Sequence, residues 1–267
     1  MIYTFYTEDG SFDLEYLDYC KAPELMAKVK DKTRINLYLG RRIFSYDRKY
    51  LSQDHKKAKI IDELIKQNND NPLQFFMPNC ARGGFDSEGH HFINDLDHQL
   101  SVILAGNRYG KSTLNWIKCL VTYGLIECDP DWMIFKEHGV KYRPWTGPKE
   151  FAIVTYELIG HQNTIWPQIV QKWTPKNELG EFANKSPNWK MNPHFQLAGG
   201  STGYFLYCSQ SQAPFESQAL DLIMWDEQGE ERKFDGANER LATRRGFHSM
   251  SMTPHKEIGR ASCRERV

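Results

Sequence analysis

The sequence lacks the features that mark membrane proteins, disulfide-rich secreted proteins and strongly charged proteins. No apolar run approaches the roughly 20 residues that a helix needs to span a bilayer, and the N-terminus lacks the basic start of a signal peptide. The six cysteines include no C-x-x-C pair, so we expect free thiols in a reducing cytosol. Basic and acidic residues balance at 34 each, so bulk charge gives no indication of a nucleic-acid partner.

What is present fits a folded protein of ordinary composition. The chain has 267 residues, of which 40% are hydrophobic and 25% charged. This length allows one large α/β domain or two modest domains with ample core. Composition alone does not indicate a function.

The first 70 residues contain helical patterns and no motif with chemical meaning. A short helix is expected over residues 23–30, and a longer one over 52–68, where Ala58, Ile61 and Leu64 recur at helical spacing. The run of Asn and Asp that ends at Pro72 is a stop signal. We therefore predict an N-terminal helical region, residues 1–70, packed on the main domain.

A polar stretch over residues 79–99 contains the adjacent histidines His90 and His91. Neighbouring residues on a strand point to opposite faces, and no cysteine or carboxylate cluster completes a ligand set. We therefore expect no metal site at these histidines.

The segment most typical of a known chemistry is residues 101–113, SVILAGNRYGKST. It begins as an apolar strand, passes through a glycine-bearing loop and continues into a helix, marked by the apolar stripe Leu114, Ile117, Val121. This is the layout of a phosphate-binding P-loop, although Ala105 occupies the position of the first glycine. That position shapes the turn, whereas close phosphate approach requires Gly106 and Gly110.

Strands and helices alternate through the rest of the chain. Strands are expected at residues 151–155, 220–225 and 247–252, with a glycine-turn hairpin over 194–208. Helices are expected at 161–173, with a kink at Pro167, and at 238–245. This alternation predicts a mainly parallel sheet covered by helices on both faces, in which ligands bind at the carboxyl ends of the strands.

Two carboxylates follow the strand at 220–225. Asp226 is placed to support Mg²⁺ together with Ser112, and Glu227 is placed to polarise an attacking water, while Lys111 faces the β- and γ-phosphates. A GKS tripeptide or an Asp-Glu pair alone occurs by chance. Together, each after a buried strand, they predict a P-loop ATPase over residues 71–256. A kinase is less consistent with Glu227, which suits water activation.

These motifs resemble the ATPase part of the large terminase subunit of tailed phages, the motor that packages viral DNA. The resemblance covers roughly residues 70–256. It rests on residues 105–113, similar to the arginine-containing Walker A of that family, on residues 222–227, similar to its Walker B with catalytic glutamate, and on residues 241–254, similar to the stretch that ends in its coupling motif.

The resemblance implies an ASCE, RecA-like fold and roles for individual residues. Arg108 would sense the γ-phosphate as a catalytic residue beside Lys111 and Glu227, and Ser251 and Thr253 would couple hydrolysis to DNA movement. Arg240, Arg244 and Arg245 are candidates for a trans-acting arginine finger, or ordinary solvated charges. The nucleotide-binding set comprises Ala105, Gly106, Asn107, Arg108, Tyr109, Gly110, Lys111, Ser112, Thr113 and Gln74.

Gln74 has two open interpretations. It resembles the adenine-contacting glutamine of the family, but it is equally explained as a surface glutamine beside Phe75 and Phe76. The insertion between Gln74 and Gly106 is longer than the resemblance leads us to expect.

The resemblance also implies cofactors, partners and location. ATP and Mg²⁺ would bind the site. Double-stranded DNA, a portal protein, a terminase small subunit and further copies in a ring would be the partners, with no membrane, in the host cell cytoplasm and outside the virion.

The end of the chain departs from the family. No nuclease domain follows Pro254, and residues 257–267 look like a translated sequencing adapter, so we expect them to lie outside the native fold. We therefore expect a truncated chain that hydrolyses ATP weakly and does not cut DNA. A helicase-like or other nucleic-acid-dependent ATPase, and a module that binds nucleotide without turnover, remain alternatives.

Overall fold

The computed structural model describes residues 34–39, 42–47, 63, 66–76, 88–106, 110–136, 138–190, 192–216 and 219–253. The helix expected at 23–30, the loop residues Asn107, Arg108 and Tyr109, and the segment 257–267 lie outside these ranges. The chain divides into two units, residues 1–90 with 130–140 and residues 91–129 with 141–267.

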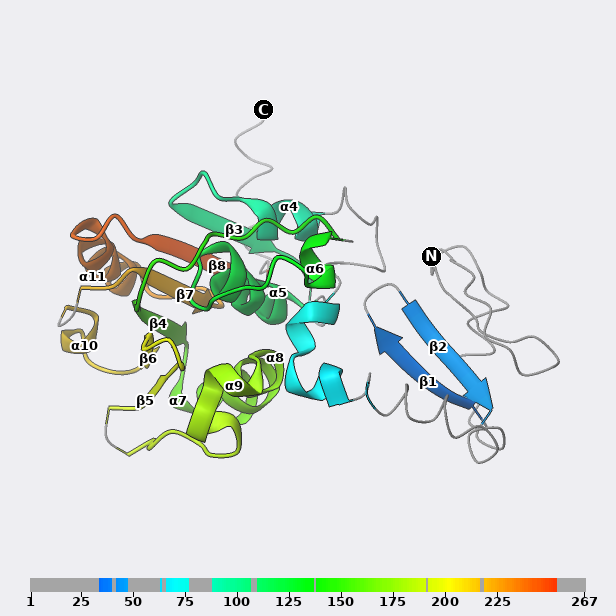
Figure 1. Cartoon of the computed structure of the whole chain (residues 1–267). Helices are drawn as coiled ribbons and strands as arrows, with labels where there is room; N and C mark the ends of the chain where they lie inside the picture. Colours follow the sequence, from blue (N-terminus) through cyan, green and yellow to red (C-terminus); the bar gives the residue numbers. More distant parts are fainter. Residues whose placement is uncertain are drawn as a thin grey trace. The chain divides into compact units, whose positions relative to one another are not determined.

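The first unit contains strands as well as helical turns (Figure 1). Strands β1 (Arg34–Leu39) and β2 (Arg42–Asp47) pair antiparallel. Residues 66–70 are helical, and η1 (Pro72–Phe75) and α6 (Met133–Lys136) follow. The region 1–70, predicted to be helical, therefore also contains two strands, and the alternation of Ile35, Leu37 and Leu39 has the period of two that is typical of a strand.

The second unit is built on one six-stranded sheet in the order β3-β8-β7-β4-β6-β5. Every neighbouring pair is parallel except β5 with β6, which is the predicted hairpin. The strands are β3 (Leu100–Leu104), β4 (Glu150–Thr155), β5 (His194–Gln196), β6 (Thr202–Tyr207), β7 (Leu222–Asp226) and β8 (Phe247–Met252). The predicted α/β architecture, a mainly parallel sheet with helices, is confirmed.

Helix α4 precedes this sheet, and the other helices lie between its strands in the chain (Figure 1). These helices are α4 (Glu88–Asn94), α5 (Lys111–Ile117), η3 (Lys118–Thr122), α7 (Leu158–Gly160), η4 (His161–Val170), α8 (Gln171–Trp173), α9 (Lys176–Leu179), η5 (Gly180–Ala183), α10 (Ala213–Glu216) and α11 (Glu231–Ala242). Both η3 and η4 are π-helical, and Pro167 lies inside η4. Helix α11 starts at Glu231, earlier than predicted. Charged residues dominate its first turns, so apolar spacing does not indicate them.

Apolar side chains fill both faces of the sheet. On the face of α5 and η4, aromatic rings form one cluster, with centroid distances of 5.9 Å for Trp116–Phe151 and 5.2 Å for Trp166–Phe195. On the face of α11, the buried cluster includes Trp225 and Leu241. Such burial on both faces explains the continuous apolar runs of the central strands.

Two buried histidines predict how stability depends on pH. His161 Nε2 donates to the Leu206 carbonyl oxygen at 2.7 Å, and His248 Nε2 donates to Asn238 Oδ1 at 2.7 Å. Burial lowers the pKa of His161 and of His248 to about 4. Since the unfolded chain binds these protons near pH 6.5, stability is lost as pH falls from there towards 4, by roughly 1.4 kcal/mol per pH unit for each histidine.

Urea unfolding at about pH 7 and about pH 5 measures this effect, because most carboxylates stay ionised over that interval. The protein is expected to be less stable at the lower pH. Equal stability at both values, or greater stability at the lower one, would contradict the assignment of neutral buried histidines.

Candidate active site

The turn into α5 depends on a glycine. Gly110 is the N-cap of α5 with a φ of +87°, in the left-handed region, and its carbonyl accepts from Leu114 N–H at 2.9 Å. Glycine adopts this conformation without the steric cost that a Cβ brings. Among the residues that the structure describes, no atom lies within 4 Å of a Cβ added at Gly106 or at Gly110.

Lys111 is buried in the first turn of α5 and contacts three segments of the chain. Its Nζ donates to the Gly106 carbonyl oxygen at 3.3 Å and to Thr253 Oγ1 at 3.0 Å. The same Nζ lies 4.0 Å from Glu227 Oε1. The ammonium group therefore lies between the loop after β3 and the ends of β7 and β8.

Ser112 and Asp226 meet directly, as the sequence predicts. Ser112 Oγ donates to Asp226 Oδ1 at 2.5 Å, and Ser251 Oγ donates to the same oxygen at 3.0 Å. Burial raises the pKa of Asp226, whereas these two hydroxyl groups oppose the rise. A hydroxyl and a carboxylate are oxygen ligands of the kind that Mg²⁺ prefers, so these two residues fit this ion.

Glu227 occupies a backbone conformation that is rare for a side chain of its type. Its φ is +77°, and its N–H donates to the Ser251 carbonyl oxygen at 2.8 Å. The carboxylate accepts from Thr253 N–H at 3.0 Å and from Thr253 Oγ1 at 2.8 Å. A left-handed residue of this kind costs about 1 kcal/mol or more and is typical of functional sites.

Together these residues form a cation, three hydroxyls and two carboxylates at the carboxyl edge of the sheet. A phosphate chain entering there meets Lys111, and the exposed part of Glu227 can hold a water molecule. These are the residue types that nucleotide binding and hydrolysis require.

Two other predicted residues have different partners in the described part of the chain. Gln74 lies in the first unit, where its Nε2 donates to the Gln67 carbonyl oxygen at 3.2 Å. Arg244 Nη1 pairs with Asp221 Oδ2 at 2.8 Å, at the amino end of β7 and opposite to Asp226. An adenine-contacting Gln74 and an arginine finger acting on another copy stay predictions.

His90 and His91 lie on helix α4, not on a strand. His90 Nε2 is 2.8 Å from the His138 carbonyl oxygen, a contact within the first unit. Among the described residues there is no cluster of three metal-ligating side chains.

Within the same ranges, no helix is long and apolar enough to cross a membrane.

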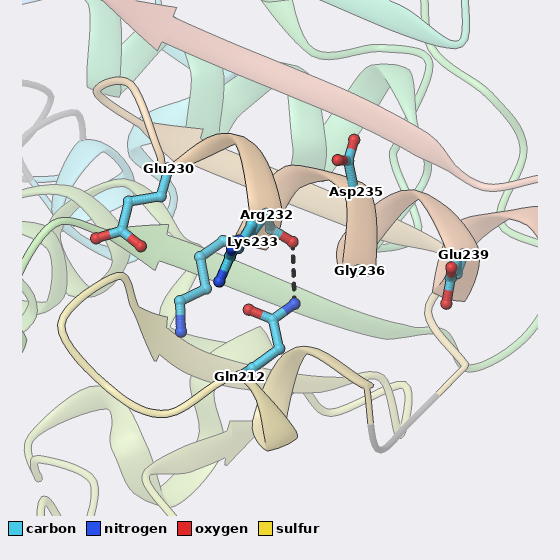
Figure 2. Close-up of a pocket in the computed structure, with 7 residues that line it drawn as sticks. All are labelled: Gln212, Glu230, Arg232, Lys233, Asp235, Gly236 and Glu239. Atoms are coloured by element: carbon cyan, nitrogen blue, oxygen red, sulfur yellow. Dashed lines mark hydrogen bonds between the residues drawn. The ribbon is translucent and has the colours of Figure 1, made fainter.

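A hollow of about 450 Å³ lies beside α11, away from the predicted site (Figure 2). Gln212 Nε2 donates to the Arg232 carbonyl oxygen at 2.9 Å across it. Lys233 is buried, and its Nζ donates to the Gln210 carbonyl oxygen at 2.6 Å. The lining residues are Gln212, Glu230, Arg232, Lys233, Asp235, Gly236 and Glu239, so no predicted site residue contributes to this hollow.

Asn115 is a residue of the site region that sequence reasoning misses. It is fully buried, and its amide bonds to the backbone of both β7 and β8. An asparagine within a helix gives no sequence signal for this, because its partners are more than 100 residues away.

Comparison with known proteins gives structural neighbours alone. No family model and no curated protein matches the chain.

Three of the structural neighbours are large terminase structures from a thermophilic bacteriophage. One has a TM-score of 0.40 at 11% identity, covering 62% of this chain and 38% of that one. The complex with ADP has a TM-score of 0.36 at 14% identity, covering 62% and 38%. The complex with ATP-gamma-S has a TM-score of 0.33 at 11% identity, covering 63% and 34%. The chain thus spans well under half the length of these terminases.

Proposed function

We propose that this chain hydrolyses ATP as the motor domain of a viral terminase large subunit, which drives double-stranded DNA into a procapsid. The observation that carries the ATPase part is the convergence of Lys111, Ser112, Asp226 and Glu227 from α5 and β7 at one edge of the sheet. The motor part rests on the order of the three sequence motifs.

Each residue has a distinct task in the proposed reaction. Lys111 exchanges its bonds to Thr253 and Gly106 for bonds to the β- and γ-phosphates. Ser112 and Asp226 would hold Mg²⁺, which when bound neutralises charge on the phosphate oxygens. Glu227 orients the attacking water and accepts its proton.

The proposed partners follow from the motor role. They are double-stranded DNA, a portal protein, a terminase small subunit and further copies of the chain in a ring. ADP and ATP-gamma-S are the nucleotides named for two of the phage terminase structures, and we propose ATP with Mg²⁺ for this chain.

The test is phosphate release from ATP by the purified chain with Mg²⁺, with and without double-stranded DNA. Lys111→Ala is expected to lower the rate by about 100-fold, or to background, because the site loses its only described cation next to the phosphates. Lys185→Ala is the matched control, since Lys185 is exposed and pairs with Glu181 at 3.3 Å, away from the site.

Equal rates for the wild type and Lys111→Ala would refute the ATPase proposal. Stimulation by DNA would support the motor role. A rate that DNA leaves unchanged would count against the motor role while leaving ATP hydrolysis intact.

A further inference from the structure

We propose that Asn115 is a positioning residue that aligns the three elements of the site, so that the groups on α5 face the carboxylates on β7. This inference rests on the proposed ATPase function and deepens it. Asn115 touches neither of the two carboxylates in the described contacts, and it acts through the backbone that carries them.

Nearly all of the hydrogen-bonding capacity of the Asn115 amide is used. Its Nδ2 donates to the Trp225 carbonyl oxygen at 3.0 Å and to the Ser249 carbonyl oxygen at 3.3 Å. Its Oδ1 accepts from Ser249 Oγ at 2.5 Å. A primary amide has two donor hydrogens and one acceptor oxygen. Here both hydrogens and the oxygen are bonded to protein groups, and the side chain is shielded from solvent.

The positions of these partners explain the effect on the site. Asn115 lies one helical turn after Lys111, on the same side of α5. Trp225 immediately precedes Asp226, and Ser249 lies two residues before Ser251. One side chain therefore connects the helix of Lys111 and Ser112 to both strands whose ends supply the remaining groups.

Trp225 is also held from the opposite face of the sheet. Its Nε1 donates to His248 Nδ1 at 3.0 Å, and His248 Nε2 in turn donates to Asn238 Oδ1 of α11. Since the indole N–H is a donor only, this pair fixes the tautomer of neutral His248. With Trp225 fixed on this face, Asn115 sets how α5 lies against it on the other.

Asn115→Leu tests the proposal, because leucine has a similar shape and cannot bond to the two carbonyls or to Ser249. The expected result is a fall in kcat of about 10- to 100-fold, the range for residues that orient catalytic groups. The KM for ATP is expected to change by less than about threefold, because Lys111 keeps its place in the first turn of α5.

Thr122→Val is the matched control. Thr122 is also fully buried, lies two turns further along the same continuous helix, and donates from Oγ1 to the Ile93 carbonyl oxygen at 2.7 Å. Its other described side-chain bond goes to the Lys141 carbonyl oxygen at 3.4 Å, so neither bond reaches β7 or β8. This variant loses a buried hydrogen bond and is expected to keep both kcat and KM within about twofold of wild type.

A second readout needs no catalysis. In nucleotide-free protein, amide hydrogen exchange is followed at Glu227 N–H and Thr253 N–H, which bond to the Ser251 carbonyl and the Glu227 carboxylate. Asn115→Leu is expected to speed exchange at both amides, and Thr122→Val at neither. Asn115→Ala, which adds no bulk, replaces the leucine variant when that variant does not fold.

The two readouts separate the possible failures. Absent hydrolysis in the wild type would remove the proposed function, while faster exchange in the Asn115 variant would still show the alignment. Exchange and kcat that match those of Thr122→Val would overturn the positioning role.

Discussion

Glu227→Gln is expected to reduce ATP hydrolysis by about 1,000-fold while nucleotide binding stays intact. Glutamine keeps the shape of the side chain and can still accept from Thr253, but it cannot take the proton of the attacking water. The negative charge 4.0 Å from Lys111 Nζ is also lost. Because this charge competes with the phosphates for Lys111, nucleotide affinity is expected to rise or to stay equal.

Phosphate release and equilibrium binding of ATP, measured on the same preparation, check both parts. Glu231→Gln is the control, since Glu231 is exposed in the first turn of α11. A variant that retains a tenth or more of the wild-type rate would exclude Glu227 as the base. A variant that loses binding together with hydrolysis would point to a role in holding the nucleotide.

Gly203→Ala is expected to destabilise the fold by about 2 kcal/mol or more. A Cβ at Gly203 would lie 2.5 Å from Phe151 Cζ and 2.6 Å from Phe195 Cε1, which are far inside normal contact. Both rings are fully buried and pack against each other with their centroids 5.6 Å apart. Neither ring can therefore move aside without disturbing the aromatic core.

Thermal unfolding measures this effect, with Gly160→Ala as the control. Gly160 lies in α7, where the same Cβ would meet Thr155 Cβ at an ordinary 3.5 Å. Alanine favours a helix over glycine, so this control is expected to match or slightly exceed wild-type stability. Equal melting temperatures for Gly203→Ala and wild type would contradict the packing described for β4, β5 and β6.

The parts of the fold that could be predicted are those with local signals. The strand, glycine loop and helix around Lys111 appear in consecutive residues, and Asp226 with Glu227 directly follows an apolar strand. The alternation of strands and helices then predicts a parallel sheet, because parallel strands need crossover connections. The approach of Ser112 to Asp226 follows from that sheet.

The parts that could not be predicted depend on contacts between distant residues. The bond between Lys111 and Thr253 joins positions 142 residues apart, and those of Asn115 to Ser249 span 134. The π-helical geometry of η3 and η4 also leaves no composition signal. A local pattern can also mislead. The adjacent pair His90 and His91 is expected on a strand, with side chains that point to opposite faces, whereas both residues lie in helix α4.

The most direct test of the central claim is a calorimetric titration of the purified chain with ATP-gamma-S and Mg²⁺. We expect one binding site per chain and loss of that binding in Lys111→Ala. No binding at millimolar nucleotide, or equal binding by Lys111→Ala and wild type, would contradict a nucleotide site between α5, β7 and β8.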